Sequence, residues 1–316
     1  LSTGEISSGA GFRRMQDLIM HEGIALRLDA WTMELQRRDQ TCTTLDDFAA
    51  SCPTKESITE LSDYLAGNYV SGGQESTDIF VLHTGTPAAQ QDYQCENILL
   101  MHKYFLLYEE MSYTMNQGDI GRLETLFPPW ISIFRGTGKH KYASHMAKFL
   151  SDVHFVYPLK LWHAVHYNLL VNPTGLPGKF CGVDWVEESM INLYTKHTFG
   201  GSGPNYTQKR VIEESTLIKI FHDCHNNIER NFCLTSITSK HGLPNLSKSL
   251  EMVKIYTEKY KPNVHQPGRK AIYKVSDVMD LGQHIIFNLG GAVGDLEEKV
   301  NQAVEEDDLA TELCSW

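Results

Sequence analysis

The spacing of apolar side chains along the chain predicts helices almost throughout. Residues 12–38 and 88–117 repeat apolar positions every three or four residues, which is the period of an amphipathic α-helix. The second segment also has apolar side chains on its other sides, as is typical of a helix at the centre of a domain. Shorter helices are predicted at 139–156, 158–170, 184–198, 207–232, 245–260 and 275–289. The expected fold is therefore mostly α, a multi-helix globular domain with at most a minor strand element.

Residues that cap or break helices support this assignment. Thr44 and Thr54 can each accept an N–H from a first helical turn, so helices are expected to begin there. Asp119 has the same role for the helix that follows residue 117, and the two prolines at 128–129 are expected to interrupt that helix. Residues 79–82 form either a short strand or a buried extended segment, and the pattern leaves both open.

The elements divide the chain into three predicted regions. Residues 1–87 form an N-terminal helical region, and 88–292 form the main helical domain with a core at about 95–235. Residues 293–316 form an acidic C-terminal tail, which is predicted to be mobile. From residue 295 onward the chain has eight acids and one lysine, so most of its net charge of −11 lies there.

Composition narrows the class of protein and its compartment. A chain of 316 residues with 41% hydrophobic content can bury a large core. No apolar run approaches the roughly 18 residues that a bilayer span needs. Residues 1–12 lack the basic and apolar regions of a signal peptide, so none is expected. The seven cysteines are scattered without C-x-x-C spacing, which favours reduced thiols. We therefore expect no membrane partner and an intracellular location, cytoplasmic or nuclear. Because the chain starts at Leu1 rather than Met, we also expect it to be part of a longer protein.

Two acid-free segments concentrate basic residues on this acidic chain. The first basic island, residues 125–151, contains Arg135, Lys139, His140, Lys141, His145 and Lys148. The second basic island, residues 259–276, contains Lys259, Lys261, Arg269, Lys270 and Lys274. Such runs either form solvated faces or meet phosphate. The candidate nucleic-acid contacts are Lys139, His140, Lys141, Arg269 and Lys270.

The first island places positive charge where a helix begins. Gly138 provides a turn, and Lys139, His140 and Lys141 follow it at the predicted helix start. A helix dipole favours acids at that end, so basic residues there suggest an arrangement that holds an anion such as a nucleic-acid phosphate. A single interface from both islands requires their exposed lysines, including Lys261, to share one face.

Two acids near residue 185 are the candidate catalytic residues. Asp184 and Glu188 are four residues apart, which places their side chains on one face of an α-helix. Two such carboxylates could bind Mg²⁺ for phosphoryl chemistry. The alternative is structural: Asp184 caps the helix and Glu187 completes a capping box.

Other candidates are weaker, and no metal centre is predicted. His222, Cys224 and His225 have metal-binding donors, but their spacing matches no established zinc module, and a histidine on an apolar helical stripe is the alternative. The glycine-rich loop 200–207 could cradle phosphate, or it could simply end in an N-cap at Asn205 or Thr207. A nucleophile elbow and a dinucleotide-binding fingerprint are both missing from the sequence, so a hydrolase or dehydrogenase has no support.

Several motifs in fixed order carry a family resemblance. They are GDIGRLETLFPPWISIFRGTGKHKYASHM, NPTGLPGKF, GVDWVEESMINLYTK and FGGSGPNYT. The chain resembles the fungal DUF6589 family, closely at 95–235 and more loosely at 12–70. The resemblance implies descent from a mobile element and a remnant of a metal-dependent nuclease or transposase. Asp184 and Glu188 would then be its acidic pair, with Mg²⁺ as the cofactor. The alternative is a non-catalytic helical binding or scaffold module.

Overall fold

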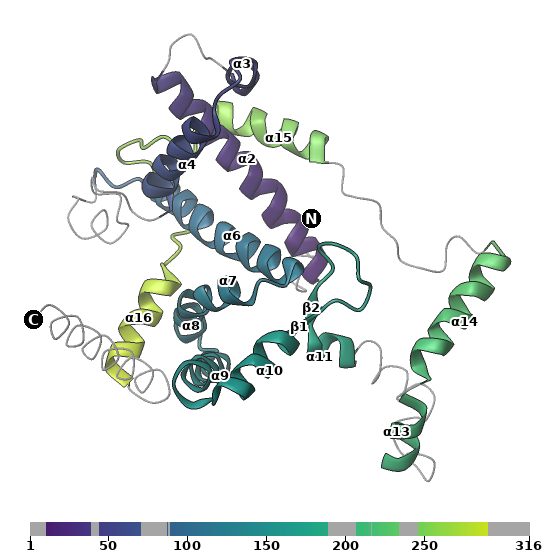
Figure 1. The fold of residues 1–316 in the computed structure, drawn as a ribbon. Helices are drawn as coiled ribbons and strands as arrows, with labels where there is room; N and C mark the ends of the chain where they lie inside the picture. Colours follow the sequence, from purple (N-terminus) through teal and green to yellow (C-terminus); the bar gives the residue numbers. More distant parts are fainter. Residues whose placement is uncertain are drawn as a thin grey trace, which may run out of the picture. The chain divides into compact units, whose positions relative to one another are not determined.

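The protein is described by a computed structural model that covers residues 11–38, 44–70, 87, 89–188, 207–215, 217–233 and 246–289 (Figure 1). These residues are mostly helical, as the apolar pattern predicts. The chain divides into two compact units, and the helix α6 runs from the first into the second. Unit 1 comprises Leu1–Glu110 and Leu243–Asp277, and unit 2 comprises Met111–Gly242 and Val278–Trp316. The predicted boundaries at 87/88 and 292/293 fall on or beside residues outside the described ranges.

Unit 1 is built from helices that begin at or within one residue of their predicted starts, except α6, which begins at Tyr93 rather than at residue 88. They are α2 (Phe12–Arg38), α3 (Leu45–Ala50), α4 (Lys55–Tyr69), the first part of α6 (Tyr93–Gln117) and α15 (Leu246–Tyr260). Thr44 accepts from Asp47 N and forms a full capping box, and Thr54 accepts from Ser57 N. Both predicted N-caps are confirmed. The core between α2 and α4 contains Ala30, Leu35, Leu61 and Leu65.

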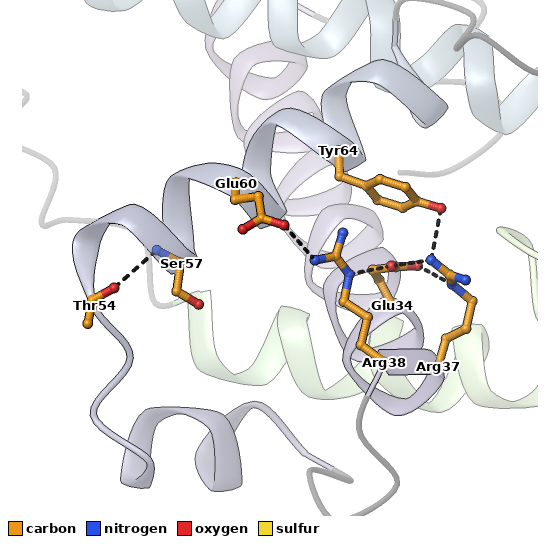
Figure 2. Close-up of polar contacts among 7 residues, drawn as sticks. All are labelled: Glu34, Arg37, Arg38, Thr54, Ser57, Glu60 and Tyr64. Carbon is orange, nitrogen blue, oxygen red and sulfur yellow. Dashed lines mark hydrogen bonds and ion pairs between the residues drawn. The ribbon is translucent and has the colours of Figure 1, made fainter.

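A polar cluster joins the end of α2 to α4 (Figure 2). The side chain of Glu34 is only 7% exposed, and Arg37 Nη2 and Arg38 Nε each lie 2.7 Å from its Oε1. Arg37 also donates to the Tyr64 hydroxyl at 2.9 Å, and Arg38 lies 3.6 Å from Glu60. Burial by itself would raise the pKa of Glu34, but the hydrogen bonds from both arginines bring that pKa below its ordinary value. Glu34 is therefore ionised and holds two arginines against α4.

We expect Glu34→Gln to destabilise unit 1 by about 1.5 kcal/mol at neutral pH, because it removes charge-assisted hydrogen bonds that solvent partly screens. Because folding lowers the pKa of Glu34, its ionised carboxylate stabilises the folded state at pH values above the unfolded-state pKa. This stabilisation is lost as pH falls through the folded-state pKa. The difference between the two proteins should therefore shrink as pH falls below the ordinary glutamate pKa of about 4.3, and it should vanish only below the lowered folded-state pKa. Urea denaturation at pH 7 and at about pH 3 measures this. Glu60→Gln is the control, since Glu60 is 79% exposed. A constant difference at both pH values would contradict the assignment.

Unit 2 contains short helices and one small sheet. The elements are α7 (Ile120–Thr125), α8 (Phe127–Gly136), α9 (His140–Ser151), the π-helix η1 (Asp152–Val156), α10 (Leu159–Leu169), β1 (Leu170–Val171), β2 (Cys181–Gly182), α11 (Val183–Val186), α13 (Gln208–Ser215), α14 (Ile218–Asn231) and α16 (Val278–Leu289). The two strands pair antiparallel, with Leu170 opposite Gly182 and Val171 opposite Cys181. In the described part of the chain this is the minor strand element that the sequence predicts.

Several local predictions are confirmed, and others lie outside the described residues. Asp119 caps α7 as predicted, accepting from Arg122 N at 3.0 Å. That helix ends at Thr125, so it is interrupted just before the prolines at 128–129 as predicted. The prolines stand in the first turn of α8, where a missing N–H costs no helical hydrogen bond. Thr207 accepts from Arg210 N at 3.3 Å and so caps α13. The strand candidate at 79–82 and the glycines of the 200–207 loop lie outside the described ranges.

Helices α8 and α16 cross in close contact at two glycines. A Cβ on Gly136 would lie 1.9 Å from Val278 O, and a Cβ on Gly282 would lie 1.7 Å from Ser132 O. Only residues without a side chain allow the two backbones to approach this closely. The crossing fixes α8, whose other neighbour is α9, and the core between these helices contains Ile131, Ala143, Ala147 and Leu150.

Candidate nucleic-acid interface

The first basic island folds into the α8–α9 hairpin. Lys139 N donates to Phe134 O at 2.7 Å, which closes the turn between the helices, and Gly138 within it has a φ of +74°. Ala143 and Ala147 on the inner side of α9 are completely buried. These small side chains let α9 lie close to α8, so the opposite side of α9 faces outward with its polar residues.

That outward side of α9 is basic. Lys141, His145 and Lys148 are exposed and follow one another at i, i+4 and i+7, which is one face of an α-helix. Lys148 is paired, because its Nζ lies 2.8 Å from Asp152 Oδ2. The basic character is therefore strongest toward the start of the helix.

The start of α9 concentrates positive charge. Lys139 is the N-cap and makes no side-chain cap hydrogen bond, and Lys139, His140 and Lys141 are all exposed. The helix dipole adds the equivalent of about half a positive charge at this end. Backbone and side chains thus attract an anion to the same place.

On the neighbouring helix, Arg135 extends this basic surface. Its Nη2 lies 3.4 Å from Ser144 Oγ on α9, and its Nε is buried without a hydrogen-bond partner in the structure. Among the described residues, no ion pair to a carboxylate is found for Arg135, Lys139 or Lys141. The described part of the chain therefore neutralises the charge of Lys148 but not that of these three side chains.

Three aromatic rings run beside this charge. The ring centroids of Trp130 and Phe134 are 5.7 Å apart, and those of Phe134 and Tyr142 are 5.4 Å apart. Tyr142 ends this row and is 63% exposed. A large aromatic face is therefore offered to solvent within one turn of Lys139 and Lys141.

The acid that precedes the island in sequence, Glu124, is turned inward. It is 9% exposed, its Oε2 lies 3.1 Å from His154 Nε2, and its Oε1 accepts a short hydrogen bond from His166 Nε2. The His166 ring also packs edge-on against Trp162 at 4.0 Å between centroids. Nothing in the spacing of Glu124, His154 and His166 along the sequence indicated that this carboxylate binds both histidines. This cluster ties η1 and α10 to α7. Because Glu124 is buried in it, this acid is not exposed next to the hairpin.

The candidate acids Asp184 and Glu188 lie exposed at a helix end. α11 ends at Val186, and residues 187 and 188 are π-helical, so the four-residue spacing does not run through continuous α-helix. The N-cap of α11 is Gly182, and it has no side-chain cap hydrogen bond. The predicted capping box of Asp184 with Glu187 is therefore wrong.

These acids are not part of a larger ligand cluster among the described residues. Asp184 Oδ1 lies 2.5 Å from the position that a Cβ on Gly182 would take, so its carboxylate folds back over that glycine. In the part of the chain that the structure describes, no group of three or more His, Cys, Asp or Glu side chains could hold a metal ion. The described residues here therefore offer two exposed carboxylates, those of Asp184 and Glu188.

Arg269 of the second basic island has a structural role. Its Nη2 lies 2.7 Å from Asp92 Oδ2, and Asp92 is fully buried. The same guanidinium donates to the carbonyl oxygens of Tyr260, Lys261 and Val264. With these bonds made, Arg269 is not available to a phosphate, whereas Lys270 beside it is exposed. The second island lies in unit 1 and the first in unit 2, so each is considered by itself.

The family of unknown function DUF6589 matches residues 3–241, well over half of the 316 residues. The chain belongs to DUF6589. No curated protein and no solved structure matches it. The DUF6589 match is broader than the resemblance at 95–235 and includes the whole α8–α9 hairpin and α11. The second basic island lies beyond it.

The apolar stripe predicted along α14 is exposed rather than buried in this DUF6589 chain. Phe221 is 41% exposed, Ile228 51% and Phe232 73%. Cys224 and His225 on the same helix are exposed as well. In the described part of the chain, every helix falls short of the length or the apolar character of a bilayer span.

Proposed function

We propose that this DUF6589 protein is a helical module that contacts nucleic acid through the α8–α9 hairpin. The phosphate backbone is contacted by Lys139 and Lys141, with His140 between them and the positive end of α9 behind them. The module is non-catalytic in this proposal, and Asp184 and Glu188 take no chemical step. Its origin in a mobile element, as the family resemblance implies, is consistent with a nucleic-acid partner.

One observation carries this proposal. Three consecutive basic side chains are exposed at a helix N-terminus, in a stretch without any acid between residues 124 and 152. Positive charge at this end opposes the helix dipole and costs stability unless an anion is bound. Nucleic acid is the partner whose closely spaced phosphates match several such charges at once. Lys270 in unit 1 is a second, separate contact in this proposal.

Salt dependence of binding tests the proposed contacts. Phosphate contacts release counterions, so log Kobs should fall linearly with log salt, and each lost contact should make that slope shallower by about 1. We expect Lys139→Ala and Lys141→Ala each to do so, measured by fluorescence anisotropy with labelled oligonucleotides over a range of potassium chloride concentrations. Lys148→Ala is the matched control on the same helix, because its charge is already paired with Asp152.

Two outcomes would contradict the proposal. One is the absence of binding to single-stranded or duplex DNA and RNA at low salt. The other is binding whose salt slope is unchanged in the Lys139→Ala, Lys141→Ala double variant. The variants lie on exposed side chains, so they should leave the far-UV circular dichroism spectrum unaltered and should not lower the unfolding midpoint of the free protein.

A further inference from the structure

Resting on the proposed function, we infer that the hairpin binds single-stranded nucleic acid, with an unpaired base stacked on Tyr142. The inference concerns the kind of nucleic acid and the residue that selects it. It depends on the aromatic row of unit 2, whereas the proposed function depends on the lysines.

The ring of Tyr142 is supported from behind and open in front. Its plane is tilted by 31° from that of Phe134, and Phe134 is in turn tilted by 34° from Trp130. Phe134 and Trp130 are half-buried between the helices, so the row is anchored in the hairpin. Tyr142 itself remains 63% exposed. A tyrosine held by a ring on one side and open to solvent on the other has the form of a stacking platform.

The position of this platform relative to the charges suits a strand. Tyr142 is three residues after Lys139 and three before His145, and side chains at that spacing are neighbours on a helix. A base that stacks on Tyr142 therefore places its flanking phosphates beside the exposed basic side chains at the start of α9. The first acid after Tyr142 in the sequence is Asp152, ten residues later, and it is paired with Lys148. No acid of α9 therefore lies beside Tyr142 to repel a strand.

A duplex would not use this arrangement. Its bases are stacked on one another, and a protein ring reaches a base face only where a base is unpaired. Lysines alone would serve a duplex equally well, since they contact phosphates without distinguishing strands from helices. The exposed ring is thus the feature that favours a single strand. DNA and RNA share this chemistry, because every base has an aromatic face.

Binding measurements on three tyrosine variants test the inference. The probes are labelled oligonucleotides of one mixed sequence, as DNA and as RNA, each single-stranded and annealed to its complement. We expect tighter binding of the single strands than of the duplexes. Tyr142→Ala should weaken single-strand binding about tenfold or more, the range expected for loss of one base–aromatic stack, and should leave duplex binding nearly unchanged. Tyr142→Phe should bind as the wild type does, because it keeps the ring and loses only the hydroxyl.

A matched control and a spectroscopic readout separate stacking from other effects. Tyr167→Ala removes a tyrosine on α10 that is 79% exposed, and it should not change binding. A 2-aminopurine base in the single strand should lose fluorescence on binding to the wild type and to Tyr142→Phe, and should keep it on binding to Tyr142→Ala.

The outcomes distinguish failure of the inference from failure of the proposed function. If single strands and duplexes bind equally and Tyr142→Ala changes neither, while the lysine variants weaken both, base stacking is refuted and the phosphate contact stands. If no probe binds at low salt, both are refuted. If Tyr142→Phe is as weak as Tyr142→Ala, the hydroxyl rather than the ring makes the contact, and stacking is refuted.

Discussion

Gly282→Ala is expected to destabilise unit 2 by about 3 kcal/mol or more, which is at or above the upper end of the usual cost of overpacking. The added Cβ would lie 1.7 Å from Ser132 O and 3.0 Å from Gly136 N. Both are backbone atoms of α8, which cannot rotate away as the end of a side chain can. The helices α8 and α16 must therefore separate, and their packing is lost along the contact. Urea denaturation followed by circular dichroism measures the change.

The control for this substitution is another helical glycine of the same unit. Gly121 in α7 has nothing within 4 Å of the position of a Cβ. Gly121→Ala should therefore be neutral or stabilise by up to about 1 kcal/mol, through the higher helix propensity of alanine. Equal stability of Gly282→Ala and the wild type would show that α8 and α16 do not cross at these glycines.

Arg269→Ala is expected to cost about 3–5 kcal/mol at neutral pH, because it leaves the carboxylate of Asp92 buried without its charge partner. Asp92 accepts hydrogen bonds from Arg269 Nε at 2.9 Å, Cys95 N at 3.0 Å and Gln266 N at 2.7 Å. The arginine also donates to the carbonyl oxygens of Tyr260, the last residue of α15, and of Lys261 and Val264 after it. Loss of the arginine should therefore release the segment after α15, which Arg269 holds next to Asp92 at the start of α6 in the same unit.

The pH dependence of this loss follows from the state of Asp92. Burial by itself would raise the pKa of Asp92, but the hydrogen bonds from Arg269 and the two backbone N–H groups lower it below the ordinary value. A carboxylate with a lowered pKa stabilises the folded state at pH values above its unfolded-state pKa. This stabilisation disappears as pH falls through the folded-state pKa. The difference between the wild type and Arg269→Ala should thus shrink in acid.

Adjacent and paired variants identify the ion pair as the cause. Lys270→Ala is the neighbouring control and should change stability by less than about 0.5 kcal/mol, because Lys270 is exposed. The double variant Asp92→Asn, Arg269→Met should recover part of the loss, since no unpaired charge remains. If this double variant is as unstable as Arg269→Ala, the pairing of Asp92 with Arg269 is contradicted.

The sequence predicts the parts of this fold that depend on neighbouring residues. The helix at 12–38 is confirmed with both ends, because its apolar period is unbroken. The caps at Thr44, Thr54 and Asp119 are confirmed, because a cap and its N–H donor are only three residues apart. Local signals decide these features, and no distant contact overrides them.

The sequence could not predict contacts between distant residues. Arg269 and Asp92 are 177 positions apart, and Glu124 and His166 are 42 apart. Arg269 lies in an acid-free basic segment of the sequence, which led to its prediction as a phosphate contact. Nothing near it in the sequence indicated that the buried Asp92 pairs with it. For Asp184, the predicted cap assumed a helix that starts at residue 184, whereas α11 already begins at Val183. The exposed basic helix start at Lys139, His140 and Lys141 could be predicted because turn, charge and helix start are adjacent in sequence.

Photo-crosslinking tests most directly whether the start of α9 is where nucleic acid binds. A single-stranded oligonucleotide with 4-thiothymidine at one position is irradiated with the protein, and the crosslinked peptides are identified by mass spectrometry. The account predicts crosslinks within the segment from Gly138 to His145, and their loss at high salt and in the Lys139→Ala, Lys141→Ala double variant. Crosslinks that fall only in other segments, or that persist unchanged in the double variant, would contradict it.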